Sequence, residues 1–182
     1  MYELKGDYQV KAVEELVKGF KELLFSGNPR TQMIFKSPTG SGKTIMMAKV
    51  LELLAEEKLD QDIVYIWAAM GELHKQSYNK LKNQYLPDSE FNMILLEQMT
   101  ADALPTNTIL FCNWESLFRT KARETDEGIE IIDWDNVYVR IGENGRNLQE
   151  VLKKTRRENK KIVLIFDEAH RTYLGENSQK LV

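Results

Sequence analysis

Four stretches of the chain have the spacing of apolar residues that is typical of amphipathic helices. In the first of them, Val13, Val17 and Phe20 recur every three or four residues, and Val10 and Leu24 extend the stripe at its two ends. In the second, Ile45, Met46, Val50, Leu51 and Leu54 form the expected inner face. The helices predicted in this way cover residues 8–25, 44–57, 71–86 and 147–159.

Short apolar runs lie between these helices and predict strands. The runs are "TQMIF" at 31–35, "DIVYIWAA" at 62–69, "FNMILL" at 91–96, "TILFCN" at 108–113 and "KIVLIF" at 161–166, the last expected to be buried on both sides. Strands that alternate with helices favour an α/β fold, with a mostly parallel sheet covered by helices on both faces. Residues 120–146 break the pattern and are interpreted as a hairpin-like insertion in a single domain over residues 1–182.

Charge and composition narrow the class of protein. The chain carries 25 Lys and Arg against 28 Asp and Glu, a net charge of -3, which argues against a surface that binds nucleic acid everywhere but leaves room for a local basic groove. The single cysteine, Cys112, is interpreted as a small buried hydrophobe, and with two separated histidines it disfavours a zinc site. No secretory signal or membrane-length apolar run is present, which predicts a cytoplasmic protein without a membrane partner.

The stretch "FKSPTGSGKT" at 35–44 stands between a predicted strand and a predicted helix. In that setting Gly40 and Gly42 allow the backbone amides to surround an anion, while Lys43 reaches the phosphates and Thr44 holds magnesium. A plain flexible turn is the competing interpretation, and the strand and helix on either side favour phosphate binding over it. The usual pattern begins with glycine, where this chain has Ser37. The residues predicted to bind the nucleotide are Pro38, Thr39, Gly40, Ser41, Gly42, Lys43 and Thr44.

A second candidate element, "DEAH", follows the last predicted strand. The run from Ile162 to Phe166 delivers Asp167 at the carboxyl end of that strand, where a carboxylate can hold magnesium, partly through water. Glu168 points differently and is placed to act as the general base for an attacking water. An acidic pair after a strand is usually only an exposed loop, but here it shares the chain with the glycine loop.

"SPTGSGKT" followed by "DEAH" resembles the first and second motifs of superfamily-two helicases and translocases. "ILFCNWESL" and "IVLIFDEAHR" are most similar to the Res subunit, the ATPase and translocase subunit of type III restriction enzymes. The resemblance covers nearly the whole chain and implies a RecA-like P-loop NTPase lobe that uses ATP and Mg²⁺. It also implies nucleic acid, expected to be double-stranded DNA, as a partner.

The resemblance assigns further roles residue by residue. It implies that Gln9, in "GDYQVKAV", hydrogen-bonds adenine with Tyr8 nearby, although a polar residue at a helix start is the competing interpretation. The arginine often found before this glutamine is absent, and Lys5 is near but offset. It implies that His170 couples nucleotide state to nucleic-acid binding. Trp114 is either a base-stacking residue or part of the core.

"WAAMGELHKQS" resembles the segment that touches the nucleic-acid backbone in this superfamily. Candidate contacts there are Glu72, His74, Lys75 and Gln76, with a solvated helix face as the simpler interpretation. The basic stretch "KKTRREN" admits the same two interpretations.

The chain ends soon after "DEAH" and lacks the serine- or threonine-containing motif and the second RecA-like lobe, with its arginine finger, that follow in the resembled family. We therefore expect the first lobe of a longer protein, weak or inactive alone, with a sheet strand missing between the phosphate-loop strand and the "DEAH" strand. Its expected partners are a second lobe and nuclease and modification subunits. Competing functions are a general DNA or RNA helicase, a small-molecule kinase, and a nucleotide-responsive binding module without turnover.

Overall fold

The computed structural model describes residues 3–27, 32–57, 59–113, 121–125, 128–133, 140–141 and 146–167. The chain divides into two compact units. The first comprises Met1–Asp60 and Asn79–Ser89, and the second comprises Gln61–Tyr78 and Glu90–Val182. None of the described helices is both long enough and apolar enough to cross a membrane.

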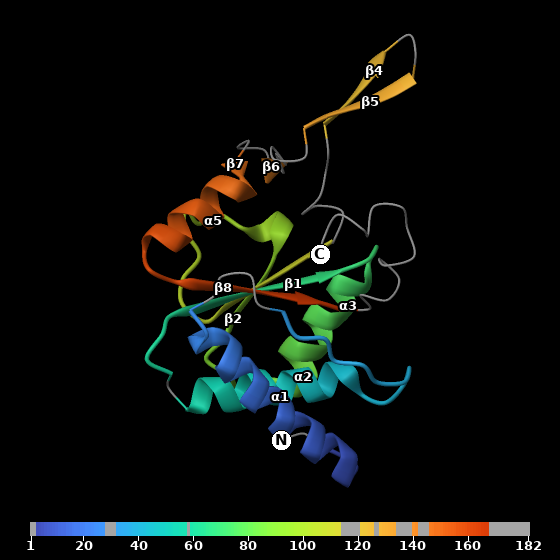
Figure 1. Cartoon of the computed structure of the whole chain (residues 1–182), viewed down its shortest axis with the longest axis vertical. Coiled ribbons are helices and arrows are strands. Elements are labelled where there is room, and N and C mark those ends of the chain that lie inside the picture. Colours follow the sequence, from blue (N-terminus) through green and yellow to red (C-terminus); the bar gives the residue numbers. More distant parts are fainter. Residues whose placement is uncertain are drawn as a thin grey trace. The chain divides into compact units, whose positions relative to one another are not determined.

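The first unit is built on two helices that pack together, α1 (Asp7–Phe25) and α2 (Lys43–Glu56) (Figure 1). Both helices were predicted within one residue at each end. The predicted inner face of α1 is wrong at its start, because Val10 is 43% exposed and Gln9 is buried instead. The buried side chain of Gln9 is hydrogen-bonded to the Lys5 amide and the Ser41 carbonyl, whereas Val10, the next residue along the helix, faces solvent. The buried residues of α1 are Gln9, Val13, Leu16, Val17, Phe20 and Leu24.

The apolar segment before the glycine loop does not form the predicted buried strand. Residues 32–36 belong to no strand, and Ile34 is 62% exposed. Met33 instead lies against α1, where its Sδ would come within 2.8 Å of a Cβ placed on Gly19. A strand needs a neighbour for its backbone hydrogen bonds, and no described strand pairs with this segment.

The third predicted helix begins as α3 (Leu73–Lys80) and then widens into a π-helical turn over Leu81–Tyr85. The turn belongs to the first unit, where it packs on α2 and closes with a 2.7 Å hydrogen bond from the Leu86 amide to the Leu81 carbonyl. Leu81 and Leu86 are buried.

The second unit contains a four-stranded parallel sheet, which confirms the predicted α/β fold. Its strands are β1 (Ile63–Ala69), β2 (Asn92–Leu95), β3 (Thr108–Asn113) and β8 (Lys161–Phe166), in the order β2-β3-β1-β8. A short 3₁₀ turn, Leu96–Gln98, follows β2. In the register, Ala68 stands between Cys112 of β3 and Phe166 of β8. The carboxyl ends of these three strands therefore meet at one edge of the sheet.

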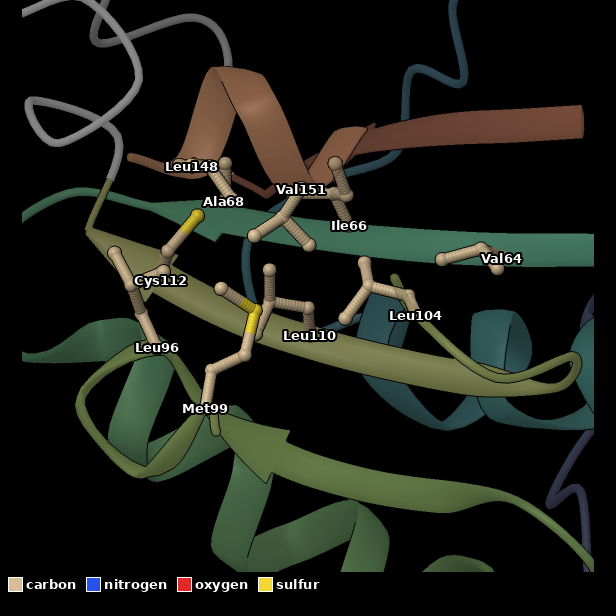
Figure 2. Close-up of a cluster of buried hydrophobic side chains, with 10 residues drawn as sticks. All are labelled: Val64, Ile66, Ala68, Leu96, Met99, Leu104, Leu110, Cys112, Leu148 and Val151. Carbon is tan, nitrogen blue, oxygen red and sulfur yellow. The ribbon is translucent and has the colours of Figure 1, made fainter. Parts of the chain in front are cut away.

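Helices cover both faces of this sheet within the second unit. On one face, α5 (Leu148–Arg157) packs over apolar side chains from alternate positions of β1 and β3, and Figure 2 shows Leu104, Met99 and Leu96 completing the cluster. On the other face, Trp67 and Phe111 stack at a centroid separation of 6.0 Å. Tyr78 of α3 meets the same Phe111 ring edge-on at 5.5 Å.

The prediction that β8 is buried on both sides is wrong. Leu164 is 49% exposed and Phe166 is 37% exposed, whereas Ile165 is buried. β8 pairs only with β1 among the described strands, so it forms an edge of the sheet and one of its faces is open.

Two small antiparallel pairs lie within or next to residues 120–146. β4 (Lys121–Thr125) pairs with β5 (Gly128–Asp133), and β6 (Arg140–Ile141) pairs with β7 (Arg146–Asn147). The first pair is a hairpin arrangement inside the stretch that the sequence marks as an insertion, and β7 leads directly into α5.

Candidate nucleotide-binding site

The glycine loop ends at the N-terminus of α2, and two of its residues have left-handed backbone conformations. Gly40 has φ +80° and Gly42 has φ +92°, a region that side-chain-bearing residues rarely adopt. At Gly42 space is also limited, because a Cβ would lie 2.6 Å from Nε2 of Gln9 and 3.0 Å from Cγ2 of Ile45, so one of these side chains would have to shift. Glycine is therefore favoured at position 42 both by the backbone conformation and by the crowding.

Gly42 is the N-cap of α2, and no side chain caps the helix. The first helical hydrogen bond runs from the Met46 amide to the Gly42 carbonyl at 3.0 Å. The amides of the first turn therefore point out of the helix end, where the helix dipole is positive. Pro38, Thr39 and Gly40 are exposed around this end. Such an end is suited to bind an anion such as phosphate.

The ammonium of Lys43 lies over the loop. Its Nζ is 3.3 Å from the carbonyl oxygens of both Ser37 and Pro38. The loop itself is closed by the Ser41 amide, which donates to the Pro38 carbonyl at 3.2 Å. Ser37, which replaces the usual first glycine, has its hydroxyl 2.5 Å from that of Ser41 and so adds a second closing contact. Phosphate oxygens are stronger partners for an ammonium than carbonyls, so they would draw Lys43 toward a bound polyphosphate.

Gln9 braces this loop from α1. Its side-chain oxygen accepts a hydrogen bond from the Lys5 amide at 2.7 Å, and its Nε2 donates to the Ser41 carbonyl at 2.8 Å. The hydroxyl of Tyr8 donates to the same carbonyl at 2.8 Å. The sequence marked Gln9 as an adenine contact, which stays a prediction, and gave no sign of its bond to the loop.

Asp167 follows β8 and is anchored to β1. Its backbone amide donates to the Ala68 carbonyl at 2.9 Å, which continues the parallel pairing by one residue. Its half-buried carboxylate accepts a hydrogen bond from the hydroxyl of Ser77 on α3 at 3.3 Å. Ser77 was not marked by the sequence analysis, although a small polar residue on the inner side of a helix that follows a strand was the available signal.

The segment after β1 separates into buried and exposed members. His74 is buried, and its Nδ1 is 2.7 Å from the Gly71 carbonyl, so its ring fixes the first turn of α3. Glu72 and Lys75 form an exposed ion pair at 2.7 Å, and this contact lowers the pKa of Glu72 and raises the pKa of Lys75. Gln76 is also exposed. Of the four residues predicted to touch nucleic acid, Glu72, Lys75 and Gln76 are accessible from solvent.

Cys112 lies in β3 and is fully buried, which confirms that it is a core residue. Burial raises the pKa of its thiol to about 12. The Nε1 donor of Trp67, on the adjacent strand β1, is buried and has no hydrogen-bond partner among the residues that the structure describes.

Three predicted site residues lie outside the described residues. They are Glu168, the predicted general base, His170, the predicted coupling residue, and Trp114, the candidate base-stacking residue.

The predicted metal ligands, each taken by itself, have a chemistry that suits magnesium bound together with a nucleotide. Within the described part of the chain, no group of three or more His, Cys, Asp or Glu side chains could hold a metal by itself. Magnesium held with a nucleotide needs only one or two protein oxygens, because phosphates and water complete its octahedral coordination. The hydroxyl of Thr44 and the carboxylate of Asp167 are oxygen donors of the required kind. They belong to different units.

A glycine loop at an uncapped helix start, in an α/β chain whose parallel sheet presents an aspartate at a strand end, is typical of phosphate-loop proteins. The chain belongs to the family described as "Type III restriction enzyme, res subunit", whose model matches residues 4–182. This agrees with the resemblance noted from the two motifs.

One solved structure is similar to the chain, the nuclease-deletion mutant of the Type ISP restriction-modification enzyme LlaGI in complex with a DNA substrate mimic. The two are 17% identical with a TM-score of 0.47, and the match covers 95% of this chain and 16% of that one. No curated protein matches the chain.

Proposed function

We propose that the chain is the ATP-binding motor lobe of a nucleic-acid-dependent ATPase, the restriction subunit of a type III restriction-modification system. Family membership supports the class of protein. The single observation that carries the nucleotide proposal is the loop before α2. There Gly40 and Gly42 have positive φ, the helix start has no side-chain cap, and the Lys43 ammonium contacts the Ser37 and Pro38 carbonyls of the loop.

Each residue of the loop has a defined part in binding. The amides of the first turn of α2 donate to phosphate oxygens, and Lys43 neutralises their charge. Thr44 and Asp167 are the residues that would hold magnesium, which, when bound, supplies charge neutralisation at the transferred phosphoryl group. Gln9 and Tyr8 keep the Ser41 carbonyl turned away from the anion by bonding to it. Glu168 is proposed as the base that accepts a proton from the attacking water.

The nucleic-acid part of the proposal rests on the family and on the exposed residues at the start of α3. The Lys75 side chain is 44% exposed and forms an ion pair with Glu72 at the surface, and because surface ion pairs contribute little, a backbone phosphate can compete for Lys75. The chain as a whole is acidic, and such contacts therefore have to be local. Binding of this kind weakens steeply as salt concentration rises.

Nucleotide binding is tested by titrating the protein with a fluorescent ATP analogue in the presence of magnesium. Replacing Lys43 by Ala removes charge-assisted hydrogen bonds and is expected to raise the dissociation constant about 10- to 100-fold. Lys49→Ala is the matched control, because Lys49 lies on the same helix in a 2.5 Å ion pair with Glu52. Equal affinity for the parent and the Lys43→Ala variant would refute the proposal.

Turnover separates the proposed motor from the competing functions. Phosphate release is measured with duplex DNA, with RNA and with neither, in the parent and in a Glu168→Gln variant. A motor of the proposed kind is stimulated by DNA, and its Glu168→Gln variant retains ATP binding but loses turnover. Stimulation by RNA would favour a general helicase, and a nucleotide-responsive module would show no turnover in either protein.

A further inference from the structure

Ser77 connects α3 to the carboxylate of Asp167. Its side chain is only 5% exposed, and its hydroxyl donates to Oδ2 of Asp167 at 3.3 Å, across ninety positions of sequence. Both residues belong to the second unit. A buried hydroxyl aimed at a carboxylate restricts the orientation of that carboxylate, because rotating the acid away would leave the hydroxyl without this acceptor.

The sheet and the turn after β1 place Ser77 at this position. Ala68 of β1 stands beside Phe166 of β8, so the two strands end together and Asp167 emerges beside the start of the turn. Gly71, at φ +51°, reverses the chain, and His74 bonds to the Gly71 carbonyl and fixes the first turn of α3. Ser77 comes three residues after His74, which is close to one helical turn, and both are therefore on the buried side of α3.

We infer that Ser77 is a positioning residue, whose buried hydroxyl orients the carboxylate of Asp167 for binding a divalent cation. This inference rests on the proposed nucleotide function and adds to it a residue that acts through Asp167.

The test measures metal binding directly in the intact protein. Mn²⁺ is titrated in the presence of a non-hydrolysable ATP analogue, and free Mn²⁺ is followed by electron paramagnetic resonance. Ser77→Ala is expected to raise the Mn²⁺ dissociation constant about tenfold, as loss of a partner that orients a metal-binding carboxylate typically does. Ser77→Thr keeps the hydroxyl and is expected to restore the parental value to within about twofold.

Ser89→Ala is the matched control for the loss of a serine hydroxyl. The hydroxyl of Ser89 donates to the Leu86 carbonyl at 2.8 Å, a bond local to its own turn, and its removal should leave Mn²⁺ affinity unchanged. If Ser77→Ala does not fold, as judged by thermal unfolding, Ser77→Cys takes its place, because a thiol fills the site but is a weak donor. Parental Mn²⁺ affinity in the folded variant that lacks the hydroxyl would overturn the inference.

Failure of the parent to bind the nucleotide analogue at all would count against the proposed function instead, so the two failures are distinguishable.

Discussion

The side-chain amide of Gln9 donates a hydrogen bond to the carbonyl of Ser41, 2.8 Å away, and thereby ties the first helix to the glycine loop. Gln9 is 6% exposed although it is polar, and its oxygen is satisfied by the Lys5 amide. The loop is therefore braced by a neighbouring helix as well as by its own internal contacts.

Replacing Gln9 by Glu is expected to disturb the loop more than replacing it by Ala. The glutamate has no N–H to offer the Ser41 carbonyl and places a buried negative charge beside it, whereas alanine only loses the bond, at a cost of about 1 kcal/mol. Thermal unfolding and ATP-analogue affinity measure the effect. Gln98→Ala is the control, because Gln98 is exposed. Glutamate behaving no worse than alanine would contradict this account of the brace.

Alanine at Gly42 is expected to be more harmful than alanine at Gly40. Both glycines have positive φ, which costs an L-residue about 1–2 kcal/mol. Of the two, only at Gly42 would the new Cβ also meet side chains, Nε2 of Gln9 at 2.6 Å and Cγ2 of Ile45 at 3.0 Å, whereas Gly40 has open space around it. Unfolding temperatures of the two single variants compare the two costs.

The double variant Gly42→Ala with Gln9→Ala distinguishes steric overlap with the Gln9 side chain from the strain of a positive φ at position 42. If overlap with Gln9 matters, the double variant is expected to be more stable than the sum of the two single losses, since removing Gln9 opens the space. Strict additivity would mean that overlap with Gln9 contributes nothing, and that backbone strain and the contact with Cγ2 of Ile45 account for the loss at position 42.

Thr155 is expected to be a stabilising residue of the second unit. Its fully buried hydroxyl donates to the Val151 carbonyl at 2.8 Å and accepts from the Leu104 amide at 2.9 Å, which fastens the loop before β3 to α5. Thr155→Val keeps the shape but leaves the Leu104 amide unsatisfied, and should lower the free energy of unfolding by about 1–3 kcal/mol. Urea unfolding measures this loss.

Two further variants control the Thr155 experiment. Thr155→Ser retains the hydroxyl and should lose much less stability than Thr155→Val. Thr100→Val makes the same chemical change at an exposed position, so it should be close to neutral. Equal losses for valine and serine at position 155 would show that packing, and not the hydrogen bond, is responsible.

Cys112 should make the protein less stable at high pH. Burial raises the pKa of its thiol from 9.0 in the unfolded chain to about 12, so the folded protein holds the proton while the unfolded chain loses it. The stabilisation is therefore complete below about pH 9 and is lost progressively as the pH rises toward 12. Comparing parent and Cys112→Ala by urea unfolding at pH 8 and pH 10.5 isolates this contribution. Parallel changes in the two proteins would exclude it.

The pattern of apolar residues was sufficient for most of the fold. The runs at β1 and β3 are continuous and buried along nearly their whole length. Such runs are predicted correctly as strands because a strand buried on both faces is apolar at nearly every position. The run at residues 32–36 has only three consecutive apolar residues and no paired neighbour among the described strands, and a strand depends on the backbone beside it. The same dependence explains why β8 was expected to be buried and is half open.

The candidate site likewise contains residues that the sequence could identify and residues that it could not. Gly42 and Lys43 were identifiable because the chemistry of phosphate binding limits the residue types and their spacing in one short stretch. Gln9 and Ser77 act through partners 32 and 90 positions away along the chain, and no local pattern encodes such contacts. Their polar character on an otherwise buried helix side was the only trace in the sequence.

The order of strands in the sheet has a consequence for synthesis of the chain on the ribosome. β1 is flanked by β3 and β8, and Ile63 pairs with Lys161, so one side of β1 stays uncovered until almost the whole described chain has emerged. During that interval the nascent polypeptide presents a long apolar ribbon with unpaired amides, which invites association with other chains or capture by chaperones. Slower translation between residues 113 and 161 would lengthen this exposure and should lower the yield of folded protein.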